Sequence, residues 1–320
     1  MAAVTAAGRW LTAPVPLGRL AAFRTLVYLF VIADLLHFTA WVRSHADVPG
    51  ELYQPLLIGR LLPFPTPGPA LVYGVFAGLL AAAAVAATGR LPRLAGTAVA
   101  LLYLQWMLIA MSYGKVDHDR FGLLVALAVL PTVGRARHGD ATRSEAAGWA
   151  LRATQLAVVA TYFLAAWAKL RFGGLEWITS ATLTWAIIRR GTALGDLLLV
   201  APWLLIAGQA GIIGFELLSP LIFSLRERWR YAAVGFLYSF HLISFATITI
   251  SFMPHLAAMT SFLPLERVRP VVWARRALRP DRSARSGQGA GGGAAGQPVP
   301  VPGDPPVGRP GQRPHRPELE

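Results

Sequence analysis

Long apolar runs separated by short polar stretches dominate the chain. The six longest runs cover residues 23–42, 69–88, 94–112, 150–168, 197–223 and 231–252. A helix that crosses a hydrocarbon core of about 30 Å needs about 20 predominantly apolar residues. The pattern therefore predicts six membrane-spanning helices at these positions.

Two shorter apolar runs, 121–133 and 254–265, leave the number of crossings open at seven or eight. Met253-Pro254 separates the second of them from the run 231–252, and proline disfavours helix in the residue before it. The end of the bundle is therefore either one long kinked helix or a hairpin of two. We expect an all-α, polytopic membrane bundle over residues 20–265, with no sheet domain.

Composition agrees with a membrane protein and excludes several classes of site. The chain is 55% hydrophobic and only 14% charged, with a mean hydropathy of +0.49; a soluble domain has about a quarter of its residues charged. It has no cysteine, which excludes disulfides, thiolate catalysis and thiolate metal ligands. Outside the bundle we expect a short N-terminal segment (1–19), a basic juxtamembrane segment (266–282) and a disordered Gly/Pro-rich tail (283–320).

The net charge of +14 predicts an orientation and a partner. If the N-terminus is cytoplasmic and 121–133 crosses, 12 basic residues lie in or beside the cytoplasmic loops and 8 lie outside. Because the positive charge sits in loops and a tail beside membrane spans, we expect membrane lipids with anionic headgroups as partners, and no nucleic acid. A membrane that the chain crosses several times is the expected location.

Ionisable residues inside apolar runs mark the candidate site, because such residues are costly in lipid and face the bundle interior. The candidates are Asp34 and His37, Glu216, His241 and Lys169, together with the loop Lys115-Val-Asp-His-Asp-Arg120. Each has a simpler reading. Asp34 and His37, three residues apart, can hydrogen-bond each other; Glu216 can be a buried carboxylate paired with an arginine; and the loop can be solvated.

Lys169 is the most informative of these residues. The chain has 30 Lys plus Arg, yet only Lys115 and Lys169 are lysines. Arginine keeps its proton at any working pH, whereas a desolvated lysine can lose it and act as a base. A lysine that only marks a membrane boundary is the competing reading.

Three motifs resemble a known family. The first is Tyr162-Phe-Leu-Ala-Ala-Trp-Ala-Lys-Leu-Arg-Phe-Gly-Gly-Leu-Glu-Trp177. The second is Asp117-His-Asp-Arg-Phe-Gly-Leu-Leu-Val-Ala-Leu, and the third joins Tyr238-Ser-Phe-His-Leu-Ile-Ser to Ile250-Ser-Phe-Met-Pro-His. Taken in their order along the chain, the three motifs resemble those of the vitamin K-dependent gamma-glutamyl carboxylases and their bacterial relatives, the horizontally transferred transmembrane (HTTM) domain proteins, over residues 20–265. The resemblance implies a bacterial inner membrane as the location. Ala166 stands where the family has glycine.

The resemblance implies a function and a set of site residues. It makes Lys169 the base toward a reduced quinone (menaquinol, or a compound similar to vitamin K hydroquinone), with His118 and His241 as further catalytic residues. We expect Tyr162, Trp167, Trp177, Glu216, Asp34 and His37 to line the cavity. A neutral lysine base asks for an apolar setting with no carboxylate nearby and is favoured by like-charge repulsion from Arg171.

Other functions stay open. The large luminal domain of the animal carboxylases has no counterpart here, which favours quinol-linked chemistry over peptide carboxylation; a peptide substrate or a separate partner subunit remains possible. A non-catalytic scaffold, a peptide-maturation or an immunity-type protein is the main alternative. A transporter would be expected to show an internal repeat, and we find none. No compact histidine spacing predicts a metal site.

Overall fold

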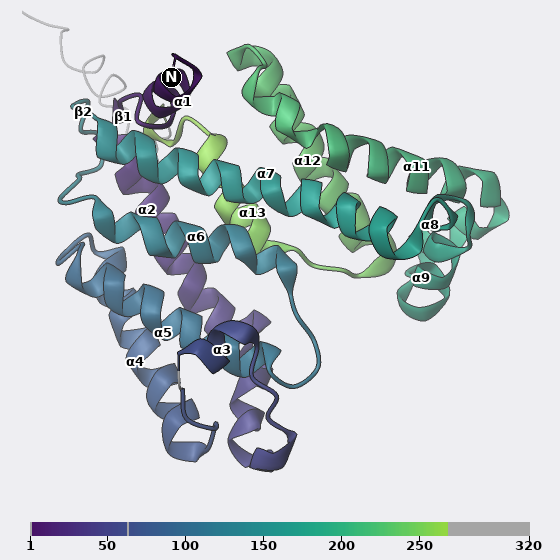
Figure 1. Ribbon diagram of the computed structural model, residues 1–320, viewed down its shortest axis with the longest axis horizontal. Coiled ribbons are helices and arrows are strands. Elements are labelled where there is room, and N and C mark those ends of the chain that lie inside the picture. The colour runs from purple at the N-terminus through teal and green to yellow at the C-terminus, as the bar shows by residue number, and fades with distance from the viewer. Residues whose placement is uncertain (1, 63, 268–320) are drawn as a thin grey trace, which may run out of the picture. The chain divides into compact units, whose positions relative to one another are not determined.

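The computed structural model describes residues 2–62 and 64–267 (Figure 1). The expected tail, 283–320, and nearly all of the expected basic segment, 266–282, lie outside these residues. In the described part, helices joined by loops make up nearly all of the structure, and the strands form one two-residue pair, β1 (Val15–Pro16) with β2 (Arg143–Ser144). The prediction of an all-α bundle is therefore confirmed.

Among the described residues, six helices are long and apolar enough to cross a membrane. They are Leu17–Phe38 (α2, Leu17–Ala33, with the π-helical turn Asp34–Phe38), α4 (Pro69–Ala87), α5 (Leu94–Met111), α7 (Glu145–Gly173), Pro202–Phe223 (α11, Pro202–Leu218, with the 3-10 turn Ser219–Phe223) and α12 (Glu227–Ile248).

Shorter elements connect and flank these helices. They are α1 (Ala2–Leu11), α3 (Leu57–Leu61), α6 (Phe121–Val129), α8 (Glu176–Thr179), α9 (Thr182–Arg190), α10 (Ala193–Asp196) and α13 (Met253–Met259), with 3-10 turns at Ala40–Asp47, Gly50–Leu52, His118–Arg120, Leu130–Thr132, Leu197–Val200, Thr260–Phe262 and Leu265–Arg267.

Local signals place several helix ends. Proline opens α4 and α11, where its missing N–H costs nothing. The Ser144 side chain caps α7 by accepting a hydrogen bond from the Ala147 amide at 3.3 Å. At the other end Gly174 takes a φ of 59°, which glycine adopts without strain. These caps make α7 29 residues long, longer than its apolar run.

The starts of α2 and α7 and the end of α6 lie together on one side of the bundle, which we call the basic side. The β1–β2 pair joins the first two. The buried Arg24 side chain joins α2 to the end of α6 by donating to the carbonyl oxygens of Val133, at 2.9 Å, and Gly134, at 3.1 Å. We call the opposite side, where α7 ends near Lys169, the lysine side.

The two short runs also pass between these sides. Residues 118–132 return from the end of α5 to the basic side. The end of α12 lies beside α10, where the Thr192 amide donates to the Thr247 carbonyl at 3.1 Å. From there the chain turns back through α13. Glu266 then reaches Arg19 at 2.7 Å, on the basic side. The end of the bundle is therefore a helix hairpin, and residues 17–267 pass eight times between the two sides.

The core follows from close packing of these passes. Phe23, Tyr28, Leu79, Trp106 and Leu127 are almost fully buried in one cluster between α2, α4, α5 and α6. A second cluster joins α7, α12 and α13. Small residues allow the approach of α6, α7 and α13: a Cβ added at Gly122 would lie 3.1 Å from Val158 and 3.2 Å from Ala258. Such contacts are typical of helices packed within a membrane.

Candidate functional site

A cavity of about 580 Å³ lies between α7, α9, α11, α12 and the start of α13. Figure 1 shows α8 and α9 at the end of α7, beside α11. Most of the cavity wall is apolar and aromatic. Its polar side chains include six of the residues expected from the sequence: Lys169, His118, His241, Tyr162, Glu216 and Trp177.

Lys169 and Glu216 form an ion pair at the centre of this polar group. The Lys169 Nζ donates to both carboxylate oxygens of Glu216, at 2.6 and 2.7 Å. The expectation that Lys169 has no nearby carboxylate is therefore wrong, and so is an arginine partner for Glu216. The physical reason is the burial of Glu216, whose side chain is only 7% exposed. A carboxylate in an apolar wall keeps its charge only beside a cation.

A tyrosine and two histidines form a second polar group in the cavity. The Tyr162 hydroxyl lies 2.6 Å from His241 Nε2. The ring of Tyr162 also packs edge-on against His255, with centroids 4.7 Å apart. In the described part of the chain, Nδ1 of His241 and both ring nitrogens of His255 are buried without a hydrogen-bond partner. Buried polar atoms normally have partners, so these three nitrogens are available to a bound molecule.

His255 is the site residue that sequence reasoning missed. It is 1% exposed, and it follows Pro254 at the end of the third motif. An ionisable residue next to a proline within an apolar run was the available signal. The family resemblance assigns a role to the first histidine of this motif, His241, and none to His255.

His118 reaches the cavity from the 3-10 turn before α6, and a buried network fixes this turn. Arg120 donates from Nη1 to Asp34 Oδ2 at 2.8 Å, and the Tyr103 hydroxyl donates to the same oxygen at 2.9 Å. His118 also borders a second cavity of about 570 Å³, which shares Lys169 with the first. The neighbouring Asp119 also lines the first cavity.

Asp34, His37 and Trp167 were expected to line the cavity and do not. Asp34 is fully buried in the network with Arg120, whereas His37 is exposed and Trp167 is 53% exposed on α7. Asp34 and His37 do not pair because Asp34–Phe38 is a π-helical turn. Its wider turn puts residues three apart on different faces.

Gln209 holds the segment that closes one wall. It is fully buried on α11, and its Oε1 accepts from the Leu183 amide at 2.8 Å. Its Nε2 lies within hydrogen-bond distance of the carbonyl oxygens of Trp177, Ile178 and Ser180, at 2.6 to 2.9 Å. One side chain thus ties α8 and α9, which supply Trp177 and Leu183 to the cavity, to a membrane-spanning helix.

We expect Gln209→Leu to loosen this wall. The change leaves the Leu183 amide without its partner, and an unsatisfied buried group costs about 1–3 kcal/mol. Hydrogen–deuterium exchange should rise in residues 177–185 and stay unchanged in α4. Equal protection in both proteins would contradict the role of Gln209 as a clamp.

Within residues 2–62 and 64–267 no group of three or more histidine or acidic side chains could hold a metal ion.

Comparison with known proteins places this architecture in a family. The family model described as the HTTM domain matches residues 13–267, which include all eight passes and every residue of the cavity. No curated protein and no solved structure matches the chain. The family match covers well over half of the sequence, and all three motifs lie within it. The chain belongs to the HTTM domain family.

Proposed function

We propose that the protein is a quinol-dependent membrane enzyme whose cavity takes a reduced quinone and whose Lys169–Glu216 pair removes a proton from it. The observation that carries the proposal is a hydrogen-bonded lysine and carboxylate in the wall of a largely apolar cavity. An ion pair with a purely structural role would not require a cavity beside it. A cavity that only holds lipid would not require an ion pair in its wall.

The residues present fit a reduced quinone. Its ring is flat and apolar, and its hydroxyls need hydrogen-bond partners, so it asks for an aromatic wall with a few polar atoms. The wall supplies Phe215, Phe240 and Trp177, and the free nitrogens of His241 and His255 supply polar atoms. A volume of about 580 Å³ lies within the range of about 300–1,000 Å³ typical of small-molecule sites.

The ion pair gives the lysine a way to become a base. A proton can pass from Lys169 Nζ to a Glu216 oxygen, 2.6 Å away, which leaves a neutral amine and a neutral carboxylic acid. Low polarity around the pair reduces the cost of this step, because burial disfavours both charged forms. The amine can then accept a proton from a bound hydroxyl. When bound, the reduced quinone supplies that hydroxyl and two reducing electrons.

Tyr162 and His241 take a supporting role. Their hydrogen bond of 2.6 Å orients the imidazole, and its free Nδ1 is the atom that can contact a bound molecule. Oriented donors stabilise the charge that develops when a hydroxyl loses its proton. His118 lines both this cavity and the second one, and in this proposal it contacts the same bound molecule.

The wider context belongs to the same proposal. The resemblance to bacterial relatives suggests a bacterial inner membrane, and a peptide substrate or a separate partner subunit for the later steps. The basic loops suggest anionic lipids as neighbours. None of these partners is needed for quinol binding or for the first proton transfer.

The test is oxidation of menaquinol by the purified protein in air-saturated liposomes, with dissolved O2 as the electron acceptor, measured with and without added peptide and bicarbonate. We expect consumption above that of empty liposomes. If menaquinol binds but no consumption follows under any of these conditions, the protein is a non-catalytic binding protein or scaffold.

A cavity-filling variant tests whether the substrate occupies this cavity. A Cβ added at Gly211, which lines the cavity, would meet no atom within 4 Å. Gly211→Phe should therefore fold, yet weaken menaquinol binding by about tenfold or more, equal to about 1.4 kcal/mol. Gly214→Phe is the matched control, because Gly214 has the same open space one turn along α11 but lies outside the cavity wall. Equal binding by the two variants would place the substrate elsewhere.

A further inference from the structure

A second polar centre lies on the basic side of the bundle, away from Lys169. It is a cavity of about 340 Å³ between α1, α2, α7, the end of the α11 pass and the start of α12. Its wall is mainly polar, in contrast to the cavity described above. Its lining includes Arg19, Arg152, Arg230, Arg267, Gln155 and Tyr231.

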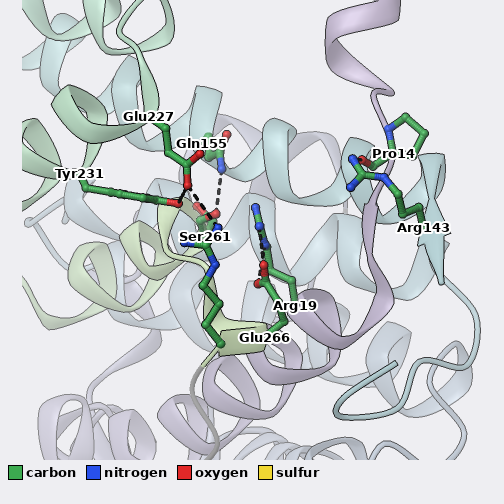
Figure 2. A network of polar contacts seen from close by, with 9 residues as sticks. Pro14, Arg19, Arg143, Gln155, Glu227, Tyr231, Ser261 and Glu266 are labelled. Carbon is green, nitrogen blue, oxygen red and sulfur yellow. Dashed lines mark hydrogen bonds and ion pairs between the residues drawn. The ribbon is translucent and has the colours of Figure 1, made fainter. Parts of the chain in front are cut away.

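Two of its four arginines are neutralised by glutamates. Arg19 forms two hydrogen bonds to Glu266, at 2.7 and 2.8 Å. Arg267 reaches Glu227 at 3.4 Å, in an exposed pair that also accepts a bond from Tyr231. Figure 2 shows these contacts gathered in one place, with Gln155 bound to the Ser261 carbonyl beside them.

The other two arginines lack a carboxylate. Among the described residues, no acidic oxygen lies within 4.0 Å of Arg152 or Arg230. Each donates only to a backbone carbonyl: Arg152 to Ala13 at 2.5 Å, and Arg230 to Leu225 at 2.9 Å. The Nε of Arg230 is buried and has no partner. Arginine stays charged at any working pH, so two positive charges face this cavity without an anion.

The cavity lies at the level of a membrane surface. Arg152 and Lys169 are separated along α7 by a rise of about 25 Å at 1.5 Å per residue, close to the thickness of a hydrocarbon core. Trp10 of α1 borders the cavity, packing edge-on against Phe223 at 5.2 Å and lying 5.5 Å from the Arg152 guanidinium. Tryptophan is enriched at the boundary between lipid and water.

We propose that this cavity binds a phosphate-bearing anion through Arg152 and Arg230. Guanidinium groups bind phosphate oxygens with paired, charge-assisted hydrogen bonds. The site is separate from the Lys169 cavity, so it does not depend on the proposed quinol chemistry. A phospholipid headgroup and a free phosphate would both bind through this chemistry. The two are distinguished by whether a lipid remains bound to the protein after it leaves the membrane.

The experiment is native mass spectrometry of the full chain purified from bilayers of phosphatidylglycerol and phosphatidylcholine in equal amounts. We expect the wild type to retain phosphatidylglycerol at least tenfold over phosphatidylcholine. Arg152→Gln/Arg230→Gln should lose this preference. Arg189→Gln, an exposed arginine on the lysine side that is outside both cavities, should keep it.

The wild type alone can overturn the proposal, even if the double variant fails to fold. The wild type could retain the two lipids in the same ratio as the bilayer, and millimolar inorganic phosphate could leave its Tm unchanged. These two results together would show that the cavity binds no such anion. Retained phosphatidylglycerol identifies a lipid headgroup as the ligand. A phosphate-dependent rise in Tm without retained lipid identifies a soluble phosphate.

Discussion

Replacing Asp34 with alanine should cost about 3–5 kcal/mol of unfolding free energy, the range measured when one partner of a buried ion pair is removed. Asp34 is fully buried, and the Arg120 side chain is 8% exposed, so the change leaves a buried guanidinium without its anion. The Tyr103 hydroxyl loses its acceptor in the same step. Unfolding in mixed micelles, followed by tryptophan fluorescence, gives the free energy.

The neighbouring His37 provides the control. It lies in the same π-helical turn but is exposed, so His37→Ala should change stability by less than about 0.5 kcal/mol. The double variant Asp34→Leu/Arg120→Leu should recover part of the loss, because it removes both charges at once. Similar losses for Asp34→Ala and His37→Ala would contradict this account of the network.

The Asp34 network also has an expected effect on the site. Arg120 follows His118 by two residues, so release of Arg120 frees the turn that carries His118 into the cavity. Hydrogen–deuterium exchange of residues 117–121 should therefore rise in Asp34→Ala. A residue outside the cavity thus supports the position of one that lines it.

The membrane passes could be predicted from the sequence because a single physical requirement produces them. Runs such as 69–88 and 94–112 meet the length of the hydrocarbon core, and their helices, α4 and α5, begin at the expected residues and end one residue earlier. Helix ends were less predictable where other forces act. α7 begins five residues before its apolar run because Ser144 caps it, and the first span changes to π-helix at Asp34.

The partners of the charged residues could not be predicted in the same way. Lys169 and Glu216 are 47 residues apart, and Asp34 and Arg120 are 86 apart. No local periodicity links helices so distant in sequence, so only the packing of α7 against α11, and of α2 against the turn before α6, selects these pairs. The resemblance to a family identified His118, Lys169 and His241 as candidate site residues. It carried no information on which anion stands beside the lysine.

The pairing of Lys169 with Glu216 predicts how substitutions should combine. Lys169→Arg should lower menaquinol consumption by at least about 100-fold, the lower end of the contribution of a general base. The guanidinium preserves the charge and the contact with Glu216, so folding should be intact, but it does not give up a proton. Glu216→Gln should lower the rate by less. Because Glu216 acts through the lysine, the double variant should be no slower than Lys169→Arg alone.

Chemical rescue separates the base from a purely structural ion pair. Lys169→Ala should be inactive and should regain part of its activity when a small amine such as methylamine enters the vacated space. This rescue should be weaker in Lys169→Ala/Glu216→Gln, since the carboxylate that binds the amine and takes its proton is gone. Lys115→Arg is the matched control: the other lysine of the chain is exposed and pairs with Asp117 at 2.7 Å, so its rate should equal the wild type's. Equal turnover by the wild type and Lys169→Arg would rule out the lysine as the base. Arginine can replace lysine as a boundary cation or in a structural ion pair, but it cannot replace a lysine that acts as a base.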